Sequence, residues 1–202
     1  MPLWLAADPL VLASKSSVRR TLLANAGIPI EVQAADIDER KLEAGAPALG
    51  PAAIAVLLAR EKALAVARDH PDRLVLGADQ MLALESRRFA KPADRAAASA
   101  QLRALSGRTH ELHSAIAFVQ NGAVLFAHAS MARLTMRAFS DRFLELYLDA
   151  VGPAATESVG AYQMEGLGVE LFERVEGDYF TILGLPLIEV LGFLRRHGCL
   201  LP

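Results

Sequence analysis

The sequence has 202 residues, of which 53% are hydrophobic and 22% are charged; such a chain can bury a sizeable core, which excludes intrinsic disorder. The formal net charge of −2 at pH 7 favours neither a nucleic-acid polymer nor an anionic membrane as a partner, because both attract clustered positive charge. Cys199 is the only cysteine, so an intramolecular disulfide and a cysteine-based zinc site are excluded and a cytoplasmic location is expected.

The first half of the chain alternates between strand-like and helix-like patterns. Its N-terminal residues are apolar, but they lack a basic segment and are too short to span a bilayer, so no membrane segment is expected. A stretch rich in Ala, Gly and Pro, residues 44–56, predicts a loop that leads into a helix. Strands are predicted at residues 10–13, 28–32 and 74–84, and helices at residues 16–26 and 53–69.

The second half contains a hairpin signal. Two strand patterns, residues 110–119 and 124–136, flank Asn121 and Gly122, a pair typical of tight two-residue turns. An antiparallel hairpin beside the earlier strand–helix alternation predicts an α/β fold with a mixed sheet. No clean linker interrupts the chain, so residues 1–202 are expected to form one domain with a cleft. Further helices are predicted at residues 93–105, 141–150 and 186–196.

Two charged residues fall where the pattern asks for apolar ones. Asp79 ends the apolar run LVLGAD, on the strand face that also carries Val75 and Gly77. It either begins a turn or lies at the carboxyl end of a strand, where α/β sheets bind ligands. Lys62 follows Leu58 by one helical turn on an apolar face. It either extends to solvent or binds a phosphate in a cleft.

The segment after the first strand predicts an anion site. Ser14 and Ser16 can cap a helix whose first turns carry Arg19 and Arg20. A helix N-terminus offers free N–H groups and the positive end of the helix dipole. Arginines are more usual at the other end of a helix, so phosphate contact is favoured here over a simple capped surface helix.

An acidic cluster follows the second strand. Asp36, Asp38 and Glu39 are oxygen ligands of the kind that Mg²⁺ or Mn²⁺ prefers. Taken alone, they are more typical of a solvated acidic loop than of a metal site. The motifs GxxxxGK[ST], GxGxxG, GxSxG and HExxH are all absent, which argues against a P-loop, a dinucleotide fold, a serine hydrolase and a zinc protease.

Eight motifs carry a resemblance along nearly the whole chain. They are LVLASKSSVRRTLL, DIDE, LAREKA, LGADQ, AKPAD, LSGRTHE, GAYQMEGLG and GDYFTILGLPL. In this order they resemble the Maf family of nucleotide pyrophosphatases. The resemblance implies an α/β fold of the Maf and inosine-triphosphatase type, with two lobes around a central cleft and often a homodimer. It also implies metal-dependent cleavage of a nucleoside triphosphate to a monophosphate and diphosphate.

The resemblance also implies roles for individual residues. By motif position, Asp79 would accept a proton and, with Glu39, would lie near a divalent cation, Mg²⁺ or Mn²⁺. Such a reaction depends mainly on neutralised charge and an oriented water, so cations around the phosphates suit it. The phosphate-binding residues would be Ser14, Arg19, Lys62 and Lys91.

Three positions bear on the base. Gln80 and Glu165 resemble the branch of the family that hydrolyses 7-methyl-GTP, whereas the dTTP/UTP branch has threonine and glutamine there. Val18 departs from both branches, one of which has arginine and the other tryptophan at this position. An aromatic residue there could stack on a cationic base, and valine cannot. Tyr162 is expected to be a packing residue.

Alternatives to the 7-methyl-GTP reading remain open from the sequence. The enzyme could be of the dTTP/UTP type or an inosine-triphosphatase-type enzyme for deaminated purines. The chain could also be a nucleotide-binding regulator of cell division without catalysis, since the family is named after septum formation. The full set of charged residues favours an enzyme, because a simple binding protein would not need them all.

Overall fold

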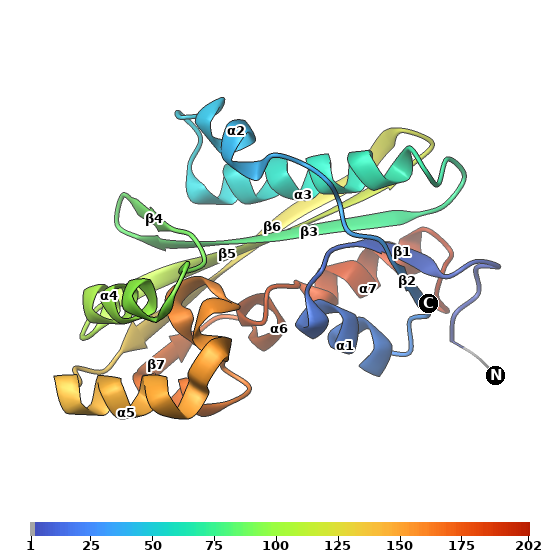
Figure 1. Cartoon of the computed structure of the whole chain (residues 1–202). Coiled ribbons are helices and arrows are strands. Elements are labelled where there is room, and N and C mark those ends of the chain that lie inside the picture. Colours follow the sequence, from blue (N-terminus) through green and yellow to red (C-terminus); the bar gives the residue numbers. More distant parts are fainter. Residues whose placement is uncertain (1–2) are drawn as a thin grey trace. The chain divides into compact units, whose positions relative to one another are not determined.

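The computed structural model describes residues 3–202, and within them seven strands form one mixed sheet in the order β2-β1-β3-β5-β6-β7, with β4 paired to β3 (Figure 1). The predicted α/β class and mixed sheet are therefore confirmed. The strands are β1 (Leu10–Ala13), β2 (Ile30–Val32), β3 (Val75–Leu84), β4 (Arg87–Phe89), β5 (Thr109–Gln120), β6 (Ala123–Met136) and β7 (Phe172–Glu176).

Seven α-helices and three short 3-10 helices accompany these strands in residues 3–202. The α-helices are α1 (Ser17–Asn25), α2 (Glu39–Ala44), α3 (Pro51–Ala67), α4 (Arg95–Leu105), α5 (Asp141–Val151), α6 (Tyr179–Ile182) and α7 (Leu187–Arg196). The 3-10 helices are η1 (Gly152–Thr156), η2 (Val159–Ala161) and η3 (Leu167–Leu171). Within the same residues, no helix is long and apolar enough to cross a membrane.

Contacts divide the chain into two compact units. Among the described residues, unit 1 comprises 3–80, 114–130 and 179–202, and unit 2 comprises 81–113 and 131–178. The chain passes from one unit to the other within β3, β5 and β6 and before α6.

Unit 1 is built in three layers around β1, which pairs in parallel with β2 and β3. Alternate residues of a strand point to opposite faces of the sheet. Leu10, Leu12 and Leu76 therefore pack against α1 and α7, while Val11 and Val75 pack against α3 (Figure 1). Because both faces are covered, these strands are continuous apolar runs, which is why the sequence pattern located them.

Gly77 sets the distance between α3 and β3. A Cβ atom at this position would collide with the carbonyl oxygen of Ala59 and lie 2.8 Å from the backbone nitrogen of Ala63. Only glycine allows the helix to approach the strand this closely. The close approach brings Lys62, next to Ala63 on α3, within reach of Asp79 on β3.

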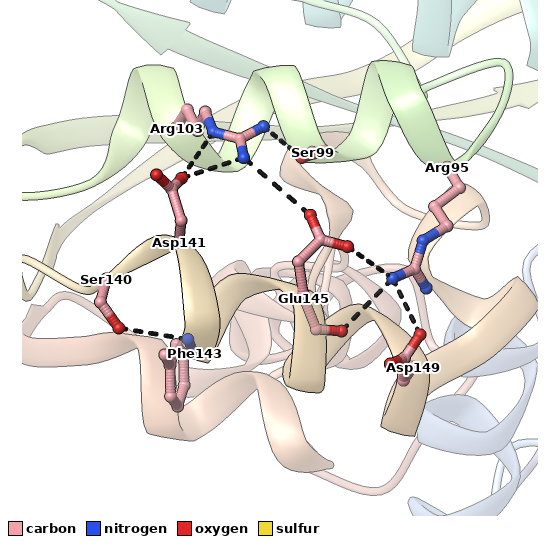
Figure 2. Close-up of polar contacts among 8 residues, drawn as sticks. All are labelled: Arg95, Ser99, Arg103, Ser140, Asp141, Phe143, Glu145 and Asp149. Atoms are coloured by element: carbon pink, nitrogen blue, oxygen red, sulfur yellow. Dashed lines mark hydrogen bonds and ion pairs between the residues drawn. The ribbon is translucent and has the colours of Figure 1, made fainter.

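Unit 2 pairs α4 with α5. Each helix begins at a capping side chain: Asp94 accepts a hydrogen bond from the backbone N–H of Ala97 (2.7 Å), and Ser140 accepts one from that of Phe143 (3.2 Å). Figure 2 shows that Arg95 of α4 faces α5, where it contacts Glu145 at 3.0 Å. Three further ion pairs join the same two helices: Arg95 with Asp149, and Arg103 with Asp141 and Glu145.

The predicted hairpin between β5 and β6 is confirmed. Asn121 and Gly122 have φ values of +53° and +71°. Two successive positive φ angles match the type I′ turn, whose twist suits two antiparallel strands.

Four elements were not predicted from the sequence. The short helices α2 and α6 and the short strands β4 and β7 carry few or no buried apolar residues, so they have no hydrophobic period. α2 occupies the acidic segment and the start of the stretch predicted as a loop, and α3 begins at Pro51, two residues earlier than expected. Proline at the first turn of a helix is common, because its missing N–H would have no helical partner there.

Candidate active site

Five of the predicted site residues lie together in unit 1. One follows the end of β1, and the others lie on four elements: α1, α2, α3 and the middle of β3. The five are Ser14, Arg19, Glu39, Lys62 and Asp79.

Asp79 and Lys62 form the centre of this cluster. Asp79 is only 6% exposed, and its Oδ1 atom accepts a hydrogen bond from Lys62 Nζ at 2.6 Å. Lys62 Nζ also lies 2.9 Å from Glu39 Oε1, on a side chain that is about half exposed. Lys62 therefore points towards the carboxylates and not into solvent, and it lies between one buried and one accessible carboxylate.

Burial raises the pKa of Asp79 above its ordinary value. The positive charges of Lys62 and Arg19 lower the pKa of Asp79 but offset only part of this effect, and the negative charge of Glu39 adds to the rise. A carboxylate with a raised pKa accepts a proton more readily than an ordinary aspartate does. Such a shift beside specific charged partners is typical of functional sites.

Arg19 is held in one orientation by the protein. Its Nε donates to the carbonyl oxygen of Gly184 (2.8 Å), and its Nη1 donates to that of Ala78 (2.8 Å) and to Ser14 Oγ (3.1 Å). Burial lowers the pKa of Arg19, while Asp79 acts in the opposite direction. Within residues 3–202 its Nη2 has no hydrogen-bond partner, so this end of the guanidinium can bind an anion.

Ser14 joins this cluster immediately before α1. Its Oγ accepts hydrogen bonds from Arg19 Nη1 and from the backbone N–H of Ser16 (3.3 Å). Both of its acceptor positions are thereby used, which leaves the hydroxyl proton free to donate. Ser16 caps the helix, as predicted, by accepting from the backbone N–H of Arg19 (3.3 Å).

The side-chain nitrogen of Gln80 is hydrogen-bonded to other groups of the protein. Its Nε2 lies 3.0 Å from Ser114 Oγ and 3.0 Å from the carbonyl oxygen of Ile182, with that of Thr181 at 3.2 Å. These acceptors show which end of the amide carries the nitrogen. The amide nitrogen therefore holds the C-terminal end of α6. The carbonyl oxygen of Gly184, two residues after α6, accepts from Arg19.

Sequence reasoning missed the supporting residues Ser114 and Thr181, both of which are fully buried. Ser114 Oγ donates to the carbonyl oxygen of Thr181 at 2.7 Å. The available signal was Ser114 itself, a polar residue within the apolar strand pattern of residues 110–119.

The other predicted site residues are spread over both units. Val18 is the half-buried second residue of α1 in unit 1. Lys91 lies in unit 2, exposed in the loop between β4 and α4. Glu165 is also in unit 2, exposed in the turn that follows Tyr162.

The acidic cluster of the sequence divides into two roles. Glu39 faces Lys62, whereas Asp38 caps α2 by accepting from the backbone N–H of Lys41 at 3.0 Å. Within residues 3–202, no group of three or more His, Cys, Asp or Glu side chains could hold a metal ion. Glu39 and Asp79 both contact Lys62 Nζ, so each has one oxygen paired with this ammonium group. Two carboxylates are enough protein ligands for Mg²⁺, which takes its other ligands from water and phosphate.

An open hollow of about 670 Å³ lies between α2 and α3 in unit 1. Its lining includes Asp38 of the acidic cluster, Leu42, Leu57 and Glu61, but none of the five residues that lie together around Asp79. The hydrogen bonds and ion pairs around Asp79 therefore define the candidate site, and the hollow does not.

One known family matches most of the chain. The model of the family described as Maf-like protein matches residues 9–197. The chain belongs to the Maf family.

Two curated relatives are similar over nearly their whole length. A protein of Rhodopseudomonas palustris named nucleoside triphosphate pyrophosphatase is 60% identical over 200 residues, which covers 99% of each chain. A protein of Rhizobium meliloti named 7-methyl-GTP pyrophosphatase is 51% identical over 193 residues, which covers 95% of this chain and 97% of the other.

Among solved structures, this Maf chain is similar in fold to a nucleoside-triphosphatase, or dITP/XTP pyrophosphatase, of Mycobacterium abscessus. That match covers 96% of this chain and 100% of the other, with 14% identity and a TM-score of 0.44. At this identity and score the likeness concerns the fold alone and supports no further conclusion.

Proposed function

We propose that this Maf protein hydrolyses a nucleoside triphosphate to a nucleoside monophosphate and diphosphate. The observation that carries the proposal is the buried carboxylate of Asp79, hydrogen-bonded to Lys62 and close to Arg19. The names of the relatives, which are 51% and 60% identical, support the same reaction.

The cluster supplies cations and donors for a phosphate chain. Arg19 offers its free Nη2, Ser14 offers its hydroxyl proton, and α1 offers the N–H groups of its first turn. Lys62 adds an ammonium group. By its motif position, Lys91 is proposed as a further phosphate ligand.

A divalent cation fits this site on charge grounds. The two cations of the cluster, Arg19 and Lys62, are already balanced by the two carboxylates of Glu39 and Asp79. A triphosphate brings several further negative charges, which the cluster alone cannot neutralise. Glu39 and Asp79 would hold Mg²⁺ or Mn²⁺. When bound, such an ion neutralises phosphate charge and polarises the bond to be cleaved.

Asp79 is proposed as the proton acceptor. Its raised pKa favours removal of a proton from the attacking water, and Lys62 and Arg19 keep enough of the carboxylate ionised for this role. Arg19, fixed by two backbone carbonyl oxygens, holds the phosphate chain in one orientation, which reduces the entropy lost on reaching the transition state.

7-Methyl-GTP is the proposed substrate. One relative carries that name, and Gln80 and Glu165 match that branch of the family. Glu165 can accept hydrogen bonds from the edge of a guanine base. Val18 is the exception, because its short aliphatic side chain cannot stack on a cationic base.

Diphosphate release from a panel of nucleotides tests the proposal. The panel contains 7-methyl-GTP, GTP, dTTP, UTP and ITP, each with Mg²⁺, with Mn²⁺ and with a chelator. We expect metal-dependent turnover that is fastest on 7-methyl-GTP. Fastest turnover on dTTP or UTP would assign the chain to that branch, and fastest turnover on ITP would indicate deaminated purines. A folded protein without turnover on any nucleotide would favour the non-catalytic regulator.

Val18→Trp tests base recognition separately. The larger ring can stack on the methylated base, so turnover of 7-methyl-GTP should rise relative to that of GTP. An unchanged or lower ratio would contradict the assignment of this position. Val18→Leu, which changes size without adding an aromatic ring, is the matched control.

We also propose a cytoplasmic homodimer. Light scattering of the purified protein measures its mass in solution and distinguishes the dimer from a monomer of 21.7 kDa.

A further inference from the structure

One side chain of unit 2 joins two loops that are far apart in the sequence. Gln101, on α4, donates from Nε2 to the carbonyl oxygen of Ala90 at 2.7 Å. Its Oε1 accepts from the backbone N–H of Gly160 at 3.2 Å. Both ends of a single amide are therefore used, one on each loop. A carbonyl at one end and an N–H at the other determine the orientation of the amide.

The first loop carries Lys91. It runs from the end of β4 at Phe89 to Asp94, the cap of α4. Lys91 itself is exposed, and within residues 3–202 its side chain has no hydrogen-bond or ion-pair partner. The bond from Gln101 to Ala90 holds the backbone immediately before Lys91. It is therefore a direct tether on the backbone from which this lysine projects.

The second loop carries Glu165 and is held at its base. Gly160 has a φ of +81°, and a Cβ atom there would lie 2.6 Å from Cε1 of Tyr162 and 2.7 Å from Cδ1 of Leu82. The next residue, Ala161, also has a positive φ, of +60°. A backbone in this sparsely populated conformation persists only when its surroundings determine it.

Three hydrogen bonds besides that of Gln101 hold this base. Tyr147 donates its hydroxyl to the carbonyl oxygen of Ala161 (3.2 Å), and Ser158 donates to that of Tyr162 (2.5 Å). The hydroxyl of Tyr162 is paired with Nε2 of the buried His110 at 2.7 Å. Only the Gln101 bond extends from this base to the Lys91 loop.

We infer that Gln101 is a positioning residue that fixes the phosphate-binding Lys91 loop and the base-recognising Glu165 loop relative to each other. The inference rests on the proposed function, which assigns Lys91 and Glu165 to the two ends of one nucleotide. Gln101 contacts both loops through one planar amide. A shift of either loop therefore changes the distance between Lys91, which would bind phosphate, and Glu165, which would bind the base. A misplacement of about 1 Å can lower a rate by about 100-fold.

Two substitutions separate the two bonds. Gln101→Glu keeps an acceptor for Gly160 but places a second acceptor against the carbonyl oxygen of Ala90, so it releases only the Lys91 loop. Gln101→Met keeps the length of the side chain and suits a helix, but it removes both bonds. Gln120→Met is the matched control, because Gln120 also donates to a backbone carbonyl oxygen, that of Asp72, and contacts neither loop.

Hydrogen exchange measures the two bonds without reference to activity. In Gln101→Glu we expect faster exchange at the amides of Lys91, Ala93 and Asp94 and wild-type exchange at Gly160. In Gln101→Met both loops should exchange faster, and in Gln120→Met neither should. Wild-type exchange at both loops in Gln101→Met would overturn the inference, whether or not the protein hydrolyses nucleotides.

Kinetics then test the positioning role. Gln101→Glu should lower kcat/KM about ten-fold for every nucleotide while the ratio of 7-methyl-GTP to GTP stays constant, because only the phosphate end is loosened. Gln101→Met should lower kcat/KM and also reduce this ratio. Faster exchange with wild-type kinetics in both variants would overturn the positioning role. If the wild-type protein turns over no nucleotide, the proposed function fails, and the exchange experiment still decides whether Gln101 joins the loops.

Discussion

Two charge clusters in this protein use the same side-chain chemistry in opposite surroundings. In unit 1, Lys62 lies between Asp79 and Glu39, and the side chains of Lys62 and Asp79 are 13% and 9% exposed. In unit 2, the ion pairs between α4 and α5 join side chains that are 47–82% exposed (Figure 2). The hydrogen-bond distances are similar in the two clusters, so burial is what distinguishes them.

The difference shows what burial does to a charge. Water and salt screen the α4–α5 network, so its pairs add little to stability one by one. In the cluster around Asp79, solvent cannot replace a missing partner, and burial raises the pKa of the carboxyl. Such a cluster is costly to fold, and it is poised to exchange its internal partners for a substrate. The exposed network can hold two helices together, but it lacks the buried charges typical of a catalytic site.

The largest expected effect comes from removing the buried carboxylate. Asp79→Asn should lower kcat by roughly 10²–10⁴, because the proton acceptor is lost, and should leave the fold intact, since the amide has the same shape. Diphosphate release and circular dichroism measure the two effects. Asp149→Asn in the exposed network is the control and should keep wild-type turnover. A folded Asp79→Asn protein with near-normal activity would assign the proton acceptor elsewhere.

Removing a cation should destabilise the protein more in the buried cluster than in the exposed network. Lys62→Met leaves Asp79 without its ammonium partner and should lower the free energy of unfolding by roughly 3 kcal/mol. Arg103→Met, in the exposed network, should cost no more than about 1 kcal/mol. Urea unfolding of both variants measures the contrast, and equal losses would contradict it.

The same variant has a pH consequence. Lys62 lowers the pKa of Asp79, so without it that pKa rises. Since Asp79 must be ionised to accept a proton, the acidic limb of the kcat/KM profile should move to higher pH in Lys62→Met. A movement to lower pH would contradict the assigned role of Asp79.

A buried histidine shows that burial, and not the unit in which a residue lies, determines the shift of its pKa. His110 lies in unit 2 and is 1% exposed, and burial lowers its pKa to about 4 from 6.5. Between these two pH values the unfolded chain binds a proton that the folded protein does not, so stability is lost as pH falls. The loss amounts to about 3 kcal/mol. Urea unfolding at several pH values should show a flatter dependence for His110→Gln, which can still bond Tyr162. An unchanged slope would exclude His110 as its source.

The smallest effect is expected in the exposed network. Glu145 contacts both Arg95 and Arg103, so Glu145→Gln should lower the melting temperature slightly at low salt. The loss should disappear near 1 M salt, where the Debye length is about 3 Å. A loss that persists at high salt would show that burial, and not screened charge, is responsible.

Local pattern was enough to predict much of the fold and several site residues. The strands of unit 1 are buried on both faces, so continuous apolar runs located them. Asp79 and Lys62 were recognisable because each interrupts an apolar face with a charge. α2 was not predicted, because a six-residue helix without buried residues has no period to detect.

The sequence by itself determined the α/β class, the I′ hairpin, the cap at Ser16 and the identity of the charged residues, because each depends on neighbours within a few positions. Only the tertiary structure decided how these residues meet. The close approach of α3 to β3 at Gly77 lets Lys62 donate a hydrogen bond to Asp79. The fold also brings the Gln80 amide into hydrogen-bond distance of Ser114 and Ile182. It also joined Ala90 to Gly160 through Gln101. These contacts span tens of residues, and their energies come from burial and hydrogen-bond geometry that exist only once the chain has folded.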